Sequence, residues 1–201
     1  MLTIHTDGRG RAYAVRGEWI AAVGDLDTLT AAFPAARLRR WPGILTAGLV
    51  NLYGPELLDH AYHPDPREAD TLGTEPLTGP ALDALRPDDT RWGASARRGV
   101  QRMLAHGTVA VAGSPTRPAV AAAVRRSGIG TVGRLGEPQG PASLDPFACG
   151  IPADFAPDRQ EGSAARFAVF DVKDEGELAE RGASGTCVAT VVEGRIVYRR
   201  R

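Results

Sequence analysis

Three side chains of the kind that bind metal ions stand close together in the first third of the chain. His60, His63 and Asp65 are near enough in sequence for two imidazoles and a carboxylate to meet at one ion. Zinc and iron accept donor sets of this kind. Pro64 and Pro66 interrupt the regular spacing, which favours a polar, solvated loop. We therefore expect no metal cofactor, with a Zn or Fe site at His60, His63 and Asp65 as the alternative.

A second group of polar side chains follows an apolar run that ends at Leu52. Binding sites of parallel α/β sheets form where strands end, and Tyr53 and Glu56 come directly after this run. The candidate pocket for a small molecule consists of Asn51, Tyr53, Glu56, His60 and His63. The alternative, which the turn-forming Gly54 and Pro55 favour, is a turn with a packed tyrosine and no ligand.

The remaining histidines and the cysteines indicate structural roles. His5 fits the pattern of an edge strand, and His106 stands at a predicted helix end beside Gly107, where it interacts favourably with the helix dipole. Cys149 has neither a CxxC partner nor a basic neighbour to activate it. Cys149 and Cys187 are too few for a disulfide framework, which favours a reducing cytoplasm.

Hydrophobic periodicity and turn residues predict the elements that position these side chains. Strands are predicted over residues 2–6, 12–15, 19–23, 45–52, 108–112, 129–135, 165–172, 187–192 and 195–199. Helices are predicted over residues 26–33, from Pro55, from Asp88 or Asp89 to His106, from Ser114 or Thr116 to Gly128, and over residues 175–181. Residues 62–89 and 136–162 are rich in proline and glycine and are expected to be long loops. The alternation of strands and helices in the middle of the chain indicates a parallel α/β layer.

The charge balance and hydropathy exclude two broad classes. Lys+Arg and Asp+Glu number 24 each, so the formal net charge is zero and there is no basic footprint of a nucleic-acid-binding protein. No apolar run approaches bilayer-spanning length, and the N-terminus lacks the pattern of a secretion signal. We therefore expect a cytoplasmic protein without nucleic-acid or membrane partners. The near-exclusive use of arginine over lysine is typical of a bacterium with a high-GC genome.

Three segments are distinctive in their order along the chain. They are GEWIAAVGDLDTLTAAFPAARLRRWPGILTAGLVN (Gly17–Asn51), GVQRMLAHGTVAVAG (Gly99–Gly113), and the pair GSAARFAVFDV and CVATVVEGRIVYRR. The first resembles the passage from the small β-sandwich into the barrel of the amidohydrolase superfamily, in its imidazolonepropionase and aminodeoxyfutalosine deaminase branch. The second resembles the helix and second barrel strand of that family, and the last pair resembles the strands that return to the sandwich.

The resemblance also implies what this chain lacks. In that family the first barrel strand ends in Val-Asn-Ala-His-Thr-His, and its two histidines bind the metal. Val50 and Asn51 match the pattern here, Leu52 takes the alanine position, and Tyr53 and Pro55 take the two histidine positions. Tyrosine is a rare zinc ligand and proline has no side-chain donor. The chain is therefore expected to lack the metal-binding histidines.

The predicted fold class is α/β in two parts. Residues 1–40 and 163–201 are expected to form a small β-sandwich, the composite domain, built from both termini. Residues 41–162 are expected to form a reduced, incomplete (β/α) barrel-like parallel layer with long loops, because a complete barrel needs about 250 residues. The half of the barrel that carries the later metal ligands is thus expected to be missing, and Asp145 is a weak candidate for the eighth-strand aspartate.

Two functions are compatible with this sequence. The first is a non-catalytic, imidazolonepropionase-like remnant that binds a small ligand or a partner. The alternative is a hydrolase of non-peptide carbon–nitrogen bonds, acting on a cyclic amidine or amide or an aminodeoxyfutalosine-type substrate, with a site rebuilt around Tyr53, Glu56, His60 and His63. An unclosed parallel layer has an exposed edge and an uncovered face, so we also expect a homodimer unless the long loops cover this surface.

Overall fold

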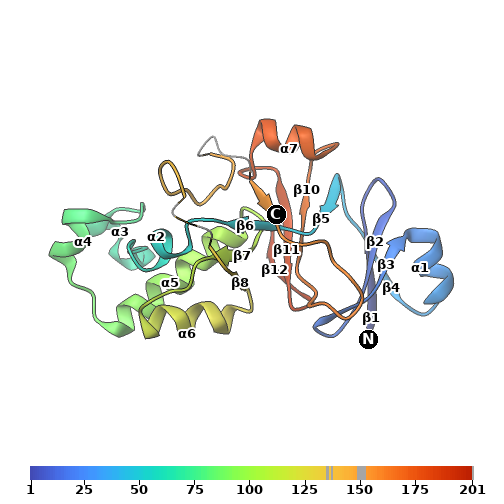
Figure 1. Cartoon of the computed structure of the whole chain (residues 1–201), viewed down its shortest axis with the longest axis horizontal. Coiled ribbons are helices and arrows are strands. Elements are labelled where there is room, and N and C mark those ends of the chain that lie inside the picture. Colours follow the sequence, from blue (N-terminus) through green and yellow to red (C-terminus); the bar gives the residue numbers. More distant parts are fainter. Residues whose placement is uncertain (135, 137, 149–152, 201) are drawn as a thin grey trace.

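The computed structural model describes residues 1–134, 136, 138–148 and 153–200 (Figure 1). The strands are β1 (Leu2–Thr6), β2 (Arg11–Arg16), β3 (Trp19–Asp25), β4 (Arg37–Arg40), β5 (Ile44–Thr46), β6 (Leu49–Asn51), β7 (Thr108–Ala112), β8 (Gly130–Val132), β9 (Asp154–Phe155), β10 (Phe167–Phe170), β11 (Cys187–Val192) and β12 (Arg195–Arg199). The helices are α1 (Leu26–Ala32), α2 (Gly54–Leu58), the 3-10 helix η1 (Pro66–Glu68), α3 (Ala69–Leu72), α4 (Gly79–Leu85), α5 (Asp89–Leu104), α6 (Pro118–Ser127) and α7 (Glu175–Arg181). None of these helices is both long and apolar enough to cross a lipid bilayer.

Two antiparallel-rich sheets from the two ends of the chain face each other as a β-sandwich. The first has the strand order β3-β2-β1-β4 and the second the order β12-β11-β10-β5. A buried apolar cluster fills the space between them, formed by Tyr13, Val15, Ile20, Trp41, Leu45, Ala165, Phe167, Val169, Val188, Ala189 and Val191. Figure 1 shows the first sheet at one end of the molecule and the second beside it. The predicted sandwich built from both termini is confirmed.

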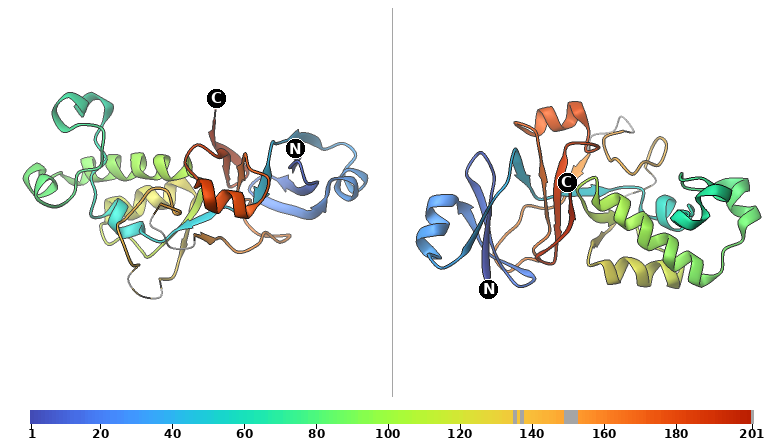
Figure 2. Two further views of the ribbon diagram at one scale, coloured as in Figure 1. Left: turned by 90° about the horizontal axis from the view of Figure 1, so that it is seen from above. Right: turned by 180° about the vertical axis from the view of Figure 1, so that it is seen from behind.

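The third sheet is a short parallel layer with the strand order β8-β7-β6-β9. Strands β6, β7 and β8 are parallel, and β9 pairs antiparallel with β6. Helices α5 and α6 pack on one face through a cluster that includes Trp92, Val100 and Val111, and Figure 2 shows them lying away from the first sheet. The predicted incomplete parallel layer is therefore confirmed, and its β6 edge is covered by β9, a strand that the sequence did not indicate.

The apolar run Leu45–Leu52 is not the single strand that was predicted. Strand β5 pairs antiparallel with β10 in the sandwich, whereas β6 pairs in parallel with β7 in the third sheet. Gly48 lies between them with a φ of +83°, and a Cβ at this position would lie 2.5 Å from the Val109 side chain. Only glycine allows both this backbone conformation and this close approach. The hydropathy pattern could not reveal the break because both sheets bury these residues.

Other predictions need smaller corrections. The segment from residue 62 to residue 89 contains η1, α3 and α4 and is not a loop throughout. The helix that Pro55 opens ends at Leu58, before His60. His5 is not on an edge strand, because β1 lies between β2 and β4.

Two predictions concern residues that the structure does not describe: Leu135, the predicted end of the strand here called β8, and Cys149. The predicted helix over residues 175–181 and the final hairpin have the expected bounds.

One buried carboxylate joins the two sheets of the sandwich. Asp7 accepts hydrogen bonds from the backbone N–H groups of Arg9 and Arg11 in the first hairpin, at 2.9 and 3.0 Å. Its other oxygen accepts from the N–H of Leu45 in β5, at 2.9 Å. Hydrogen bonds to a charged acceptor are stronger than neutral ones, so Asp7 fixes the β1–β2 turn against the second sheet.

His5 lies in the core of the sandwich as a neutral imidazole. Its Nδ1 accepts a hydrogen bond from Trp41 Nε1 at 3.1 Å, and its ring centroid lies 5.0 Å from that of Phe167. Burial, helped by the nearby charge of Arg39, lowers the pKa of His5 to about 4. The folded protein therefore resists protonation of a side chain that protonates readily once unfolded.

We expect His5 to make the fold less stable in weak acid. In the unfolded chain His5 takes up a proton below a pH of about 6.5, whereas in the folded protein it stays neutral down to a pH of about 4. Between these two values the proton binds only to the unfolded chain, so the free energy of unfolding falls by up to about 3 kcal/mol toward pH 4. Urea denaturation across this pH range should show a flatter pH dependence for His5→Gln than for the wild type. His60→Gln, at an exposed position, is the control that should keep the wild-type slope; equal slopes for wild type and His5→Gln would contradict the prediction.

Candidate functional site

Asn51 ends strand β6 and fixes the backbone that follows. The residue is completely buried. Its Oδ1 accepts a hydrogen bond from the N–H of Tyr53 at 2.9 Å, and its Nδ2 donates to the carbonyl of Ser143 at 2.9 Å. An asparagine that bonds the backbone two residues ahead stabilises a turn. The amide is thus occupied in joining the strand end to the loop around residue 143.

Tyr53 is packed and hydrogen-bonded within the fold. Its side chain is 2% exposed and belongs to the cluster beneath α5 and α6. The hydroxyl donates to the carbonyl of Gln139 at 2.6 Å. Val50 belongs to a different apolar cluster, which also contains Ala110 and Ala112. Tyr53 is therefore directed toward the helices, and its hydroxyl serves to hold the 139–144 loop.

Glu56 crosses from α2 to the segment that follows β8. Its carboxylate forms an ion pair with Arg134, with 2.6 Å between Oε1 and Nη2. The second oxygen accepts from Nη1 at 3.4 Å. Because both side chains are largely buried, this bidentate pair links the carboxyl ends of the first and third parallel strands.

Asp59 and His60, just beyond α2, have different surroundings. Asp59 is 1% exposed and accepts hydrogen bonds from the N–H groups of Thr116 and Arg117 at 2.7 and 3.2 Å. It thereby satisfies backbone donors at the start of α6, as a capping residue does. His60 is exposed on the surface.

His63 and Asp65 are held against helix α5. The His63 ring is fully buried and its Nε2 lies 2.8 Å from the carbonyl of Leu57, so Nε2 carries the proton. A Cβ on Gly99 would lie 2.7 Å from this ring, so only glycine leaves room for it. Burial lowers the pKa of His63. Asp65 pairs with Arg98 at 3.2 Å. The two residues thus contact the fold around them and do not face a common ion.

The donors at these positions do not fit the metal that the resemblance implies. The Tyr53 hydroxyl is bonded to a carbonyl, and Pro55, in the first turn of α2, has no side-chain donor. Within the described part of the chain, no three or more His, Cys, Asp or Glu side chains are grouped so that they could hold a metal ion. The structure therefore does not bring the predicted pocket residues together at one point.

Asp145 and Cys187 also have structural surroundings. Asp145 accepts hydrogen bonds from the N–H groups of Ala183 and Ser184, at 3.2 and 2.7 Å, and so joins two distant segments. Cys187 is buried beside Thr190, and burial raises the pKa of its thiol to about 12. A thiol with such a pKa is not a nucleophile at neutral pH.

Several hollows border the parallel layer, and two of them lie at the strand ends and on the open face. The smaller, of about 250 Å³, lies at the carboxyl ends of the strands, where sites of α/β proteins normally form. It is lined by Leu52, Ala112, Gly133, Arg134, Gly136, Pro138 and Asp154. None of the five predicted pocket residues lines it.

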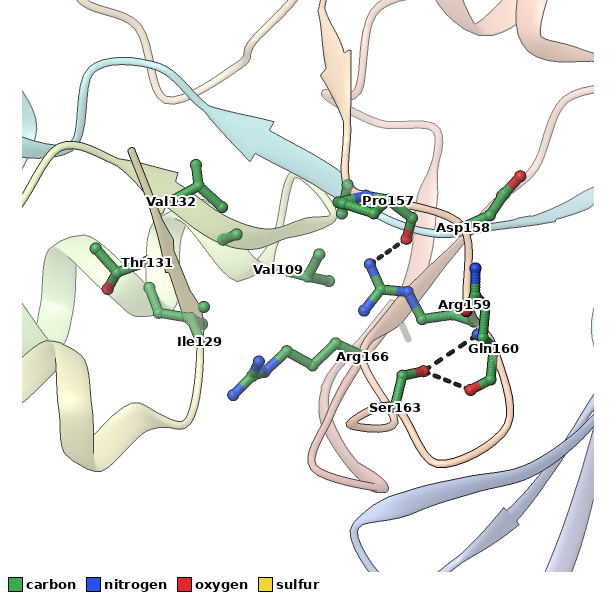
Figure 3. A pocket seen from close by; sticks show the side chains of 13 residues that line it. Val109, Ile129, Thr131, Val132, Pro157, Asp158, Arg159, Gln160, Ser163 and Arg166 are labelled. Carbon is green, nitrogen blue, oxygen red and sulfur yellow. Dashed lines mark hydrogen bonds between the residues drawn. The ribbon is translucent and has the colours of Figure 1, made fainter. Parts of the chain in front are cut away.

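The larger hollow, of about 490 Å³, lies on the face of β7 and β8 that α5 and α6 leave open. Val109, Ala110 and Val132 form its apolar side, and the segment from Ala156 to Arg166 passes over the other side. Figure 3 shows the side chains of Arg159 and Arg166 beside this space, with Ser163 bonded to Gln160 at its border. We call this space the β7–β8 hollow.

The two arginines of the β7–β8 hollow differ in how well they are neutralised. Arg166 donates from Nε to the carbonyl of Gly128 at 2.7 Å and pairs with Glu193 at 3.5 Å. Arg159 donates to the carbonyl of Pro157 but forms no ion pair with any described residue, and its buried Nε has no partner among them. Burial lowers the pKa of Arg159; Tyr13 acts in the opposite direction, Arg166 in the same direction, and the carboxylate of Asp158 in the opposite direction.

The sequence contained one signal for this hollow. Residues 136–162 were predicted to be a long loop, and long loops in compact domains are often functional. No spacing pattern singles out Arg159 or Arg166, because they meet β7 and β8 only through the path of the chain after β9.

Comparisons with known proteins support part of the predicted relationship. Residues 14–36, which comprise the end of β2, β3 and α1, match the family model of the bacterial imidazolonepropionase-like composite domain. No curated protein matches the chain. The resemblance to an imidazolonepropionase-like composite domain is therefore confirmed over this segment.

Two solved structures resemble part of the fold. Ochratoxinase from A. niger is 17% identical with a TM-score of 0.43, over 66% of this chain and 30% of its own. Guanine deaminase from Bradyrhizobium japonicum is 18% identical with a TM-score of 0.37, over 61% of this chain and 27% of its own. This chain thus spans less than a third of either protein, and likeness at this level assigns no function.

We expect Tyr53→Phe to destabilise the fold without unfolding it. The variant keeps the packed ring and loses the hydrogen bond to Gln139, which is worth about 1 kcal/mol. Tyr13→Phe is the matched control, because its buried hydroxyl has no hydrogen-bond partner among the described residues. Urea denaturation should give a lower free energy of unfolding for Tyr53→Phe and no loss for Tyr13→Phe. Equal effects of the two changes would contradict a structural role for the Tyr53 hydroxyl.

Proposed function

We propose that this protein is an imidazolonepropionase-like binding protein that has no amidohydrolase activity. The observation that carries the proposal is that the polar side chains at and just after the end of β6 are already bonded to other parts of the fold. Asn51 and Tyr53 hold the loop at residues 139–144, and Glu56 is paired with Arg134. Side chains with these contacts serve the stability of the fold, and engaging a substrate would require breaking buried hydrogen bonds.

The alternative is a hydrolase of non-peptide carbon–nitrogen bonds with a rebuilt metal site. Such an enzyme needs an ion that activates water. Of the candidate ligands, His60 is exposed, the Nε2 of His63 is bonded to the carbonyl of Leu57, and Asp65 is paired with Arg98. The ring of His63 would have to leave its place against Gly99 before it could bind an ion beside His60. These contacts favour the binding protein over the hydrolase.

Metal content and turnover test the proposal directly. Protein purified without chelator should contain far less than one equivalent of zinc or iron by elemental analysis. Added Zn²⁺ or Fe²⁺ should produce no hydrolysis of cyclic amides, cyclic amidines or an aminodeoxyfutalosine-type substrate. Near-stoichiometric metal that is lost in the double variant His60→Gln/His63→Gln, but kept in His106→Gln, would overturn the proposal. Circular dichroism of each variant establishes that the comparison is made between folded proteins.

The predicted homodimer is a second proposal, and the fold restricts where it can form. Strand β9 covers the β6 edge, and the Ala156–Arg166 segment crosses the open face of the layer. The outer edge of β8 remains for a two-fold contact, since β8 pairs only with β7 among the described strands. Light scattering at micromolar concentration should give twice the chain mass of 21.2 kDa. A monomer would contradict the dimer and assign the covering of the layer to the loops alone.

A further inference from the structure

We propose that the β7–β8 hollow binds a small organic monoanion, a carboxylate with a short apolar body, whose charged group pairs with Arg159. This inference rests on the proposed binding function and names its site and ligand class. The hollow lies on the open face of the layer, apart from the strand end at which the candidate pocket was predicted.

The charge of the site is the first support for this ligand class. Arg166 has a partial counter-charge in Glu193. Asp158 also lines the hollow, but its carboxylate is paired with Arg11 at 3.0 Å. Arg159 is thus the guanidinium of the hollow that has no carboxylate partner among the described residues. A half-buried positive charge without a partner favours an anion. Because one such charge is left, a single negative charge on the ligand balances it.

The geometry of the charged group is the second support. A guanidinium presents its N–H donors as a planar fork that matches the two oxygens of a carboxylate. The Arg159 side chain is held at one point, through its hydrogen bond to the carbonyl of Pro157. That bond limits the movement of the side chain, so less entropy is lost when an anion binds.

The apolar side of the hollow is the third support. Val109, Ala110, Val132 and Ala156 come together there, at the face of β7 and β8 opposite the helices. A volume of about 490 Å³ lies within the range of small-molecule sites, which combine an apolar wall with a few polar groups. An inorganic ion would leave this wall exposed to water, whereas a ring or short alkyl chain would cover it.

Phenylacetate and phenylacetamide are matched probes for this inference, because they differ in charge and hardly in shape. Titration of ¹⁵N-labelled full-length protein should show saturable amide shifts at Thr131, Val132 and Ser163 with phenylacetate. Phenylacetamide should bind at least about tenfold more weakly, since it lacks the charge-assisted pair. Arg159→Gln should weaken phenylacetate binding by about tenfold or more, and Arg159→Lys by less, because it keeps the charge and loses the fork.

The matched control is Arg97→Gln, which removes an exposed arginine from α5, on the other side of the layer from the hollow. It should leave phenylacetate affinity unchanged. Equal binding of acid and amide, unchanged affinity in Arg159→Gln, or shifts confined to other regions would each overturn the inference. Competition by inorganic phosphate with equal affinity would overturn the apolar part of the ligand class. A failure of phenylacetate to bind leaves the absence of hydrolase activity standing, because metal content and turnover decide that question separately.

Discussion

The whole architecture depends on the chain changing sheets within two residues after β5. Strand β5 completes the second sheet of the sandwich, and β6 begins the parallel layer. Gly48 makes the change possible with a positive φ and with its Cα set against Val109 of β7. A side chain at this position would separate β6 from β7, and the layer would lose the register on which α5 and α6 pack. The segment that crosses the β7–β8 face is hydrogen-bonded to both parts, from Ala156 N–H to the Gly48 carbonyl and from Ile20 N–H to the Ser163 carbonyl.

Polar groups at the carboxyl end and on the open face of the parallel layer make different contacts. At the carboxyl end, the polar side chains form hydrogen bonds or an ion pair with neighbouring loops, as Asn51, Tyr53 and Glu56 do. The strand end is therefore closed by its own side chains. On the open face, Arg159 retains hydrogen-bonding capacity that no described residue uses. Buried polar groups without partners cost free energy. Arg159 combines such an unsatisfied buried nitrogen with a position beside a hollow.

Local sequence patterns predicted much of the fold, and contacts between segments distant in sequence explain the errors. Asp174 caps α7, and Glu193-Gly194 turns β11 into β12, so these elements had the expected bounds. Strand β4 is rich in arginine and was not predicted. It forms because it pairs with β1, from which a hairpin and a helix separate it in sequence, and no local pattern indicates this pairing. The break at Gly48 and the position of Arg159 depend likewise on contacts between distant segments. Asn51 and Tyr53 lie at and just after the end of β6, but their contacts depend on loops whose path could not be inferred from composition.

The composite construction of the sandwich also governs the order in which the protein can form. Thr46 in β5 pairs with Ala168 in β10, and the core residue Tyr13 packs on Phe167, so the main contacts of the sandwich join residues far apart in sequence. During synthesis the first sheet leaves the ribosome long before the strands that cover its apolar face. Contacts of such long range slow folding and leave apolar surface open to aggregation meanwhile. The parallel strands β6, β7 and β8 and the helices between them form one continuous stretch of chain, from Leu49 to Val132, so this layer can assemble first and serve as the platform on which the C-terminal hairpin closes the sandwich.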